Sequence, residues 1–358
     1  MANTLLIMAG GTGGHIYPAL SVAHRLQERG WTIVWLGAKT GMEARIVPPH
    51  GFSMAWVQFT GVRGKGWRRV LGLPWSLLVA CYQSAQAIFR FRPDVILGMG
   101  GYVSFPGALM AVVLNRPLII HEQNAVAGLA NRVLAYFATR VLAGFPGAFA
   151  ANRKAQWVGN PVRADIATLP DPSQRSQDPS TRLRILILGG SQGAAALNTL
   201  IPESLALMTE NERPSVTHQA GAAHAQNLID LYARWGVKAH IVPYIEDMAS
   251  SYQAADLVIC RAGASTVAEI AAAGVASLFV PLPTAVDDHQ TLNAQFLVNR
   301  GAAQSMAQSE LTAERLSQWL RHLKKSDLIS MAAAARLAAK NDATQTVVQI
   351  CEELAHAL

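Results

Sequence analysis

The feature that most constrains the fold is a short apolar run leading into a cluster of glycines, which occurs twice. Residues 4–8 (TLLIM) lead into residues 10–14 (GGTGG), and residues 184–188 (RILIL) lead into residues 189–193 (GGSQG). An apolar run without alternation is typical of a parallel strand covered on both faces. The two copies lie about one domain length apart. The sequence therefore predicts two αβ domains that each begin with a strand and a glycine turn.

Further apolar runs extend this pattern along the chain. Two more of them end at glycine turns, residues 98–101 and 263–266, and other strands are expected at residues 32–36, 117–121, 240–243 and 275–281. Strands alternating with helical segments predict an α/β fold with doubly wound parallel sheets. Glycine turns at strand ends expose backbone N–H groups and lead into helix N-termini, both of which attract phosphate. Four such turns in one chain predict a protein that handles phosphate.

Length and composition exclude several classes of protein. The 358 residues, 51% hydrophobic and 15% charged, provide material for two cores and argue against disorder. The net charge of +7 suits an anionic partner, but no basic stripe with interleaved aromatic residues indicates a nucleic acid. Three scattered cysteines predict neither disulfides nor a zinc site. No apolar stretch reaches the ~18 residues that a membrane span needs.

The glycine turns do not match the common nucleotide-binding fingerprints. Ile16 stands where the dinucleotide motif needs its third glycine, and Gly66 stands where a Walker A motif needs Ser or Thr. The turn at residues 263–266 differs, because Ser265, Thr266 and Glu269 open a helix there. This helix start could hold a diphosphate, with Glu269 on two ribose hydroxyls. Alternatively, the three residues form a capping box that only stabilises the helix.

Seven segments occurring in order make the sequence resemble a known family. They are GGTGGH at 10–15, GMGGYVS at 98–104, HEQN at 121–124, VGNPVR at 158–163, GGSQGA at 189–194, CRAGASTVAEI at 260–270 and DDHQTLNA at 287–294. Together they resemble the MurG family, the bacterial peptidoglycan glycosyltransferases that add N-acetylglucosamine to lipid I to make lipid II. The resemblance extends over essentially the whole chain except residues 165–182, a proline-rich stretch that we expect to be a linker or long loop.

The resemblance implies a GT-B fold, in which two Rossmann-like domains face each other across a cleft. We expect an acceptor- and membrane-facing domain at residues 1–162, joined by a C-terminal helix at 341–358, and a UDP-sugar domain at 163–340. The implied reaction is an inverting transfer from UDP-N-acetylglucosamine to the polyprenyl-diphosphate lipid, without metal or cofactor. The implied setting is peptidoglycan synthesis, and hence cell shape and division, at the cytoplasmic face of the inner membrane.

Motif by motif, the resemblance also implies site residues for the donor. UDP-N-acetylglucosamine is expected to contact Thr12, Gly13, Gly14, Asn124, Arg163, Ser191, Ile245, Ala264, Ser265, Thr266, Val267, Ala268, Glu269 and Gln290. Within this set, Ile245 is expected at the uracil, Glu269 at the ribose and Gln290 at the sugar. Some relatives carry paired glutamines where this chain has His289 and Gln290, so the resemblance assigns no role to His289.

The acceptor and the chemistry are expected in the first domain. The acceptor diphosphate is expected at Gly11, Gly100, Gly101 and Tyr102. Inversion in one step requires a base that takes the proton of the acceptor hydroxyl. His15 is the first candidate because its pKa range suits that task, and Glu122 is the second. An alternative for His15 is that it positions the acceptor phosphate or orders its loop.

A membrane contact is predicted in the first domain. Arg68 and Arg69 precede an apolar helical segment that carries Leu73, Trp75 and Leu77, a pattern that fits a peripheral contact with anionic lipid. The alternative is a core helix, because Leu71, Trp75, Leu78, Tyr82, Ala85 and Phe89 also form a continuous helical stripe.

Three other functions remain as alternatives at this point. One is another GT-B enzyme, such as an antibiotic glycosyltransferase or a UDP-sugar epimerase. A second is a nicotinamide dehydrogenase, which the broken dinucleotide fingerprint disfavours. The third is a non-catalytic sensor of nucleotide sugars.

Overall fold

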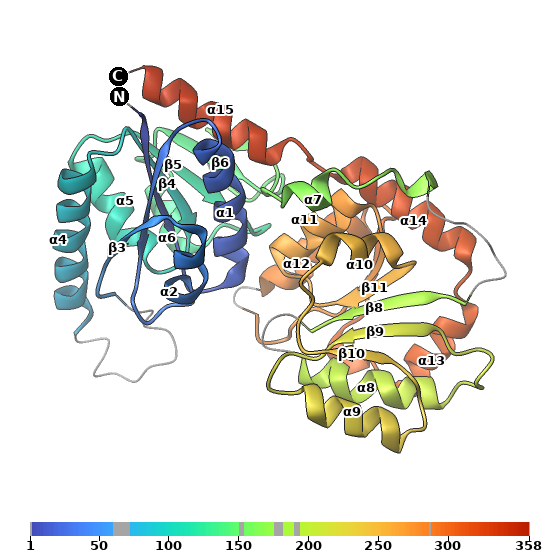
Figure 1. The fold of residues 1–358 in the computed structure, drawn as a ribbon. Helices are drawn as coiled ribbons and strands as arrows, with labels where there is room; N and C mark the ends of the chain where they lie inside the picture. The colour runs from blue at the N-terminus through green and yellow to red at the C-terminus, as the bar shows by residue number, and fades with distance from the viewer. Residues whose placement is uncertain are drawn as a thin grey trace. The chain divides into compact units, whose positions relative to one another are not determined.

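The chain divides into two compact units. The computed structural model describes residues 2–59, 72–149, 154–174, 182–189, 194–285 and 288–357. Unit 1 comprises Met1–Arg163 with Lys340–Leu358, and unit 2 comprises Ala164–Ala339 (Figure 1). Arg163 and Lys340, which we assigned to the second domain from the sequence, therefore belong to unit 1.

Unit 1 is built on a seven-stranded parallel sheet with the strand order β3-β2-β1-β4-β5-β6-β7. Its strands are β1 (Thr4–Ala9), β2 (Thr32–Gly37), β3 (Ser53–Trp56), β4 (Val95–Gly100), β5 (Leu118–Glu122), β6 (Arg140–Ala143) and β7 (Ala155–Trp157). Its helices are α1 (Gly13–Gln27), α2 (Glu43–Ile46), α4 (Leu73–Phe91), α5 (Ser104–Val113), α6 (Leu129–Leu134) and α15 (Ala343–His356).

Helices cover both faces of this sheet, which explains why its central strands are apolar throughout. Leu5 and Ile7 of β1 face a core shared with α1 and α15, whereas Leu6 and Met8 face a core shared with α4, α5 and α6. The C-terminal helix α15 packs on α1 with Val347 and its apolar stripe. In the described part of the chain, no helix has the length and apolar character needed to cross a membrane.

Unit 2 repeats the design with a six-stranded parallel sheet of order β10-β9-β8-β11-β12-β13. Its strands are β8 (Arg184–Leu188), β9 (Ser215–Gln219), β10 (His240–Val242), β11 (Leu257–Cys260), β12 (Ala276–Phe279) and β13 (Ala303–Ser305). Its helices are α7 (Ala164–Ala167), α8 (Ala195–Ala206), α9 (Ala225–Arg234), α10 (Met248–Ala254), α11 (Ala264–Ala273), α12 (His289–Val298), α13 (Ala313–His322) and α14 (Lys325–Ala338).

In both sheets the chain reverses its winding direction between the first and fourth strands. β1 lies beside β4, and β8 lies beside β11. Ligands of open parallel sheets bind at such switch points, beyond the carboxyl ends of the strands. The turns at residues 10–14 and 98–101 therefore lie together at the β1/β4 switch point, and Gly189 and the start of α11 lie at the β8/β11 switch point.

The first part of the expected linker is an ordered portion of unit 2. Ile166 of α7 and Pro172 are buried, and the Arg336 side chain of α14 donates to the backbone carbonyl of Pro170 at 2.8 Å. The apolar side chains of Ile166 and Pro172 therefore hold the segment against the rest of unit 2. The proline-rich composition of the segment gave no indication of this packing.

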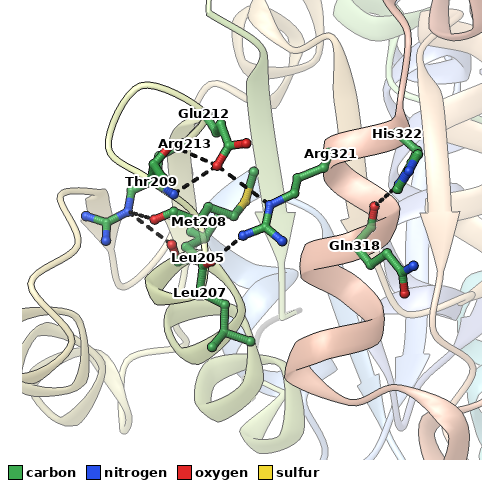
Figure 2. A network of polar contacts seen from close by, with 9 residues as sticks. All are labelled: Leu205, Leu207, Met208, Thr209, Glu212, Arg213, Gln318, Arg321 and His322. Carbon is green, nitrogen blue, oxygen red and sulfur yellow. Dashed lines mark hydrogen bonds and ion pairs between the residues drawn. The ribbon is translucent and has the colours of Figure 1, made fainter.

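Two arginines close the C-terminal end of α8 (Figure 2). Arg213 Nε donates to the Leu205 carbonyl at 3.0 Å, and Arg321 of α13 donates to the Leu207 carbonyl and forms an ion pair with Glu212 at 3.6 Å. The last carbonyls of a helix lack intrahelical donors, so these guanidinium groups satisfy them and join α8 to α13.

Candidate functional site

The switch point of unit 1 is formed by glycines that no other residue could replace without strain. Gly11, Gly100 and Gly101 have φ values of +84°, +96° and +86°. The Gly10 N–H donates to the Gly100 carbonyl at 3.4 Å, and a Cβ added to Gly101 would lie 2.2 Å from the Gly10 carbonyl oxygen. The two turns therefore contact each other backbone to backbone, which the absence of a Cβ at these positions permits.

A buried carboxylate that the sequence analysis missed holds the first turn in place. Glu43 of α2 is fully buried, and it accepts hydrogen bonds from Gly11 N at 3.0 Å and Ala38 N at 2.9 Å. Burial, and then the Glu43 charge, raise the pKa of Tyr102. The sequence around Glu43 does not predict this role, because its two hydrogen-bond partners follow two different strands, β1 and β2.

His15 lies on the first turn of α1 and is tied to the end of β5. Its Nδ1 lies 2.9 Å from Gln123 Oε1, and Gln123 Nε2 lies 3.1 Å from His121 Nδ1. His121 Nε2 in turn lies 2.9 Å from the Gly159 carbonyl oxygen. Complete burial lowers the pKa of His121 to about 4, so that this ring is neutral near pH 7. The structure thus joins the GGTGGH and HEQN motifs.

Glu122 is buried beside this network but makes different contacts. Its Oε1 accepts from Asn124 N at 3.0 Å and Asn124 Nδ2 at 3.1 Å, and its Oε2 accepts from Gly128 N at 3.2 Å and Asn131 Nδ2 at 2.8 Å. Four donors on one carboxylate order the loop between β5 and α6. Asn124, predicted at the sugar, is part of this arrangement.

In unit 2, α11 begins at the switch point without a side-chain cap. Its N-cap residue is Gly263, and Ser265 and Thr266 occupy the second and third helical positions. The capping-box alternative therefore does not apply. The N-terminal end of the macrodipole is available to an anion. Glu269 lies further along α11, where the Tyr252 hydroxyl donates to its Oε2 at 3.0 Å.

Gln290 of α12 reaches the same switch point. Its Oε1 accepts from Ala262 N at 3.2 Å and from Leu282 N at 3.0 Å, which ties α12 to the ends of β11 and β12. Arg261, which the sequence analysis did not single out, donates to the Val280 carbonyl at 2.9 Å and the Gln308 side chain at 2.6 Å. Partial burial lowers the pKa of Arg261.

The remaining predicted residues take diverse positions. Val267 is fully buried, and its N–H donates to the Gly263 carbonyl at 2.9 Å. Arg163 is half-buried at the end of the first segment of unit 1. Three predicted residues lie outside the described part of the chain: Ser191, Arg68 and Arg69.

Thr12 is exposed immediately before α1, and the predicted Gly13 and Gly14 are the first two residues of that helix. Among the predicted donor residues that the structure describes, only Ile245 lines a cavity of about 490 Å³ formed by residues of α10 and β8–β10, and no residue of α11 lines it.

Acid is expected to destabilise unit 1 because His121 is buried in its neutral form. The pKa of about 4 lies below the unfolded value of 6.5, so the unfolded chain binds more protons between these values, and stability falls as pH is lowered from 6.5 to 4. The loss by pH 4 should be roughly 3 kcal/mol. Urea unfolding at pH 7 and pH 4 measures it, and His121→Gln should reduce it. An equal pH dependence in both proteins would contradict this assignment.

Comparisons with known proteins identify the family of this chain. Residues 5–143 match the glycosyltransferase family 28 N-terminal domain, and residues 184–347 match the family's C-terminal domain. A protein from Dechloromonas aromatica named UDP-N-acetylglucosamine--N-acetylmuramyl-(pentapeptide) pyrophosphoryl-undecaprenol N-acetylglucosamine transferase is 53% identical over 355 residues, covering 99% of this chain and all of the relative. A protein of the same name from Burkholderia thailandensis is also 53% identical, over 99% of this chain and 97% of the relative.

A solved structure gives the same result for the fold. The crystal structure of Acinetobacter baumannii MurG matches 98% of this chain and 99% of its own length, with a TM-score of 0.83 at 39% identity. The two doubly wound units have the Rossmann-like topology of GT-B glycosyltransferases. The chain therefore belongs to glycosyltransferase family 28 and, within it, to the MurG family.

Proposed function

We propose that this protein transfers N-acetylglucosamine from UDP-N-acetylglucosamine to undecaprenyl-diphosphate-N-acetylmuramoyl-pentapeptide, with inversion at the anomeric carbon. The product is lipid II, a precursor of peptidoglycan. The observation that carries this proposal is the 53% identity to transferases of this name over 99% of the chain. Both phosphate-ready switch points required by a diphosphate donor and a diphosphate acceptor are present.

Unit 2 is proposed to bind the donor. Ala264, Ser265, Thr266, Val267 and Ala268 are assigned to the diphosphate, because they lie at the start of α11, where the helix dipole favours an anion. Glu269 binds the ribose with a carboxylate that Tyr252 orients. Gln290, anchored through its Oε1, presents its amide nitrogen to the sugar. Ile245 is assigned to the uracil.

The remaining donor contacts follow from the motifs. Arg163 and Ser191 are assigned to the nucleotide, and Thr12, Gly13, Gly14 and Asn124 to the sugar. The Asn124 side chain already donates to Glu122, which holds its amide in a fixed orientation.

Unit 1 is proposed to bind the acceptor diphosphate and to supply the base. Gly11, Gly100, Gly101 and Tyr102 surround the turn-to-turn contact, where backbone can approach an anion closely. His15 takes the proton of the acceptor hydroxyl as its oxygen attacks the anomeric carbon and the bond to UDP breaks. Backbone N–H groups and helix ends stabilise the departing diphosphate. The four hydrogen bonds of Glu122 favour a structural role for this carboxylate.

The exposed face of α4 is proposed to contact an anionic membrane surface. Trp75, Leu78, Tyr82 and Phe89 share one face of α4 and are between 63% and 73% exposed. The core-helix alternative for this stripe is therefore wrong, because Ala80, Ser84, Ala87 and Ile88 on the opposite face are the buried ones. Of the residues predicted to touch the membrane, Trp75 is exposed, whereas Leu73 and Leu77 are half-buried.

Neighbouring helices of the same face extend this apolar surface. Exposed large side chains there are Val113 at the end of α5, and Leu129, Val133, Tyr136 and Phe137 on and just after α6. Several large apolar side chains exposed on the helices of one face are typical of an interaction site, and a lipid-linked acceptor makes the membrane the proposed partner. We accordingly propose a peripheral location at the cytoplasmic face of the inner membrane.

Replacing Trp75, Leu78 and Tyr82 together by Ser is expected to weaken binding to vesicles that contain anionic lipid by about a hundredfold. Each side chain contributes on the order of 1 kcal/mol at a lipid interface. Vesicle co-sedimentation measures the affinity, while UDP-N-acetylglucosamine binding should stay unchanged. A matched control replaces Ile229, Trp235 and Leu337, which are exposed apolar residues of unit 2. Equal losses in both triple variants would argue against a specific membrane face.

The proposed activity is tested by mixing the protein with UDP-N-acetylglucosamine and a lipid I analogue in excess chelator and following UDP release. Release that requires the acceptor and is unaffected by the chelator supports a metal-independent transferase. UDP release at the same rate without acceptor would instead indicate a hydrolase or an epimerase. Absence of release from folded protein would contradict the proposal.

A further inference from the structure

His15, Gln123 and His121 form a chain of hydrogen bonds, and backbone carbonyl groups determine which atom donates at each step. At its far end, His121 Nε2 lies 2.9 Å from the Gly159 carbonyl oxygen, which can only accept a hydrogen bond. The proton of the His121 ring is therefore on Nε2. Because His121 is fully buried and neutral, its Nδ1 carries a lone pair and must accept.

The orientation of the Gln123 amide follows from this. Its Nε2 lies 3.1 Å from the accepting Nδ1 of His121 and 3.3 Å from the His121 backbone carbonyl, which again can only accept. The amide nitrogen thus faces His121, and Oε1 faces His15 at 2.9 Å. An amide oxygen cannot donate, so the hydrogen of this contact belongs to His15 Nδ1.

Packing holds each member of the chain in position. Gln123 is 1% exposed, and its backbone carbonyl accepts from Asn160 Nδ2 at 2.9 Å. His15 lies directly against Gly100, where an added Cβ would be 2.7 Å from its Nδ1. Gln123 and His121 have few alternative rotamers in such a site.

We propose that Gln123 and His121 are positioning residues that hold His15 in the tautomer with the proton on Nδ1, leaving the Nε2 lone pair to act as the base. This inference rests on the proposed function, in which His15 deprotonates the acceptor. The hydroxyl proton moves to Nε2 as the new glycosidic bond forms and the bond to UDP breaks. His15 then carries both ring protons, with Nδ1–H still bonded to Gln123, and releases the Nε2 proton to solvent.

The arrangement differs from a histidine oriented by a carboxylate. A neutral amide fixes the tautomer and the ring orientation but contributes no negative charge, and it cannot take up the Nδ1 proton. The positive charge that develops during the reaction therefore stays on His15, which favours rapid return of the proton to solvent.

The tautomer can be read directly from the ¹⁵N chemical shifts of the His15 ring, which distinguish a nitrogen that carries a proton from one that does not. In the wild-type protein near neutral pH or above, we expect a protonated Nδ1 and an unprotonated Nε2. Gln123→Met, similar in size but without a hydrogen-bonding group, should lose this preference, whereas Gln123→Glu keeps an acceptor oxygen and should retain it. A His15 tautomer with the proton on Nε2 in the wild type would overturn the inference.

Kinetics provides the second test on the same variants. Gln123→Met should lower kcat at least tenfold, within the ~10²–10⁴ that a positioned base contributes, while the KM for UDP-N-acetylglucosamine changes little. Gln123→Glu should keep more activity than Gln123→Met. Equal kcat in Gln123→Met and wild type would overturn the positioning role. The two proposals can also fail separately. If the wild type shows the expected tautomer but the His15→Ala variant is fully active, His15 is not the base, whereas the assigned hydrogen-bond chain still holds.

Discussion

Replacing His15 by Ala is expected to lower kcat by roughly 10²–10⁴-fold, the usual contribution of a positioned general base. The affinity for UDP-N-acetylglucosamine should change little, because the nucleotide contacts other than Arg163 are assigned to unit 2, and His15 is not among them. His15 lies on the first turn of α1, at the switch point of unit 1, and its ring is held by Gln123 at 2.9 Å. The measurement is steady-state transfer to a lipid I analogue, together with nucleotide binding by calorimetry.

His24→Ala provides the matched control, because His24 lies on the same helix but its ring contacts His50 at 2.9 Å rather than the switch point. Its kcat should stay within a factor of a few of the wild type. A near-normal kcat for His15→Ala would exclude His15 as the base. Equal losses in the two variants would show that kcat responds to disturbance of α1 and not to the lost imidazole.

Replacing Gly101 by Ala is expected to destabilise unit 1 by about 3 kcal/mol or more. Its φ of +86° costs a residue with a Cβ roughly 1–2 kcal/mol. The added Cβ would also lie 2.2 Å from the Gly10 carbonyl oxygen, and a backbone atom cannot rotate away as a side chain can. Overpacking of this kind costs a further 1–3 kcal/mol. Urea unfolding at neutral pH measures the change.

Gly30→Ala separates the two contributions. Gly30 has a similar φ of +82°, but an added Cβ there meets no atom within 4 Å. This variant should lose only the 1–2 kcal/mol of backbone strain. If Gly101→Ala were no less stable than Gly30→Ala, the close contact between the two turns would not constrain the fold.

Continuous apolar runs made most central strands predictable from the sequence. The predicted strand at residues 184–188 is β8 itself, and the predicted strands at residues 4–8 and 32–36 fall within β1 and β2. β9 escaped prediction because it carries a polar residue inside the core. His218 is fully buried there, satisfied by the Tyr232 hydroxyl at 3.0 Å and Asn198 Oδ1 at 3.1 Å. Only the folded chain brings these partners together.

The glycine turns were predictable because the requirement for φ > 0 is local, but their pairing was not. The sequence suggested that the turns at residues 10–14 and 189–193 correspond to each other. The strands that lead into these turns, β1 and β8, do hold the same place in the two sheets. What the repeat did not show is that residues 10–14 lie beside 98–101, and the end of β8 beside the end of β11. Each switch point is thus assembled from the ends of two strands that are distant in the sequence.

Side chains whose roles depend on distant partners were not predictable. Glu43 anchors a turn 32 residues away, and the Gln123 contact with His15 spans 108 residues. The spacing of Trp75, Leu78 and Tyr82 on α4 is equally compatible with a core and with a surface. Which of the two it is depends on the neighbours of α4, and these leave the stripe exposed.

The proposed reaction is a single displacement at the anomeric carbon of UDP-N-acetylglucosamine by the acceptor hydroxyl. It is tested most directly by determining the linkage in the product formed from this donor and a lipid I analogue, using proton NMR of the released disaccharide. Because the donor is α-configured, one displacement aided by His15 predicts a β-linked N-acetylglucosaminyl disaccharide. An α-linked product, or UDP release without any disaccharide, would contradict the account.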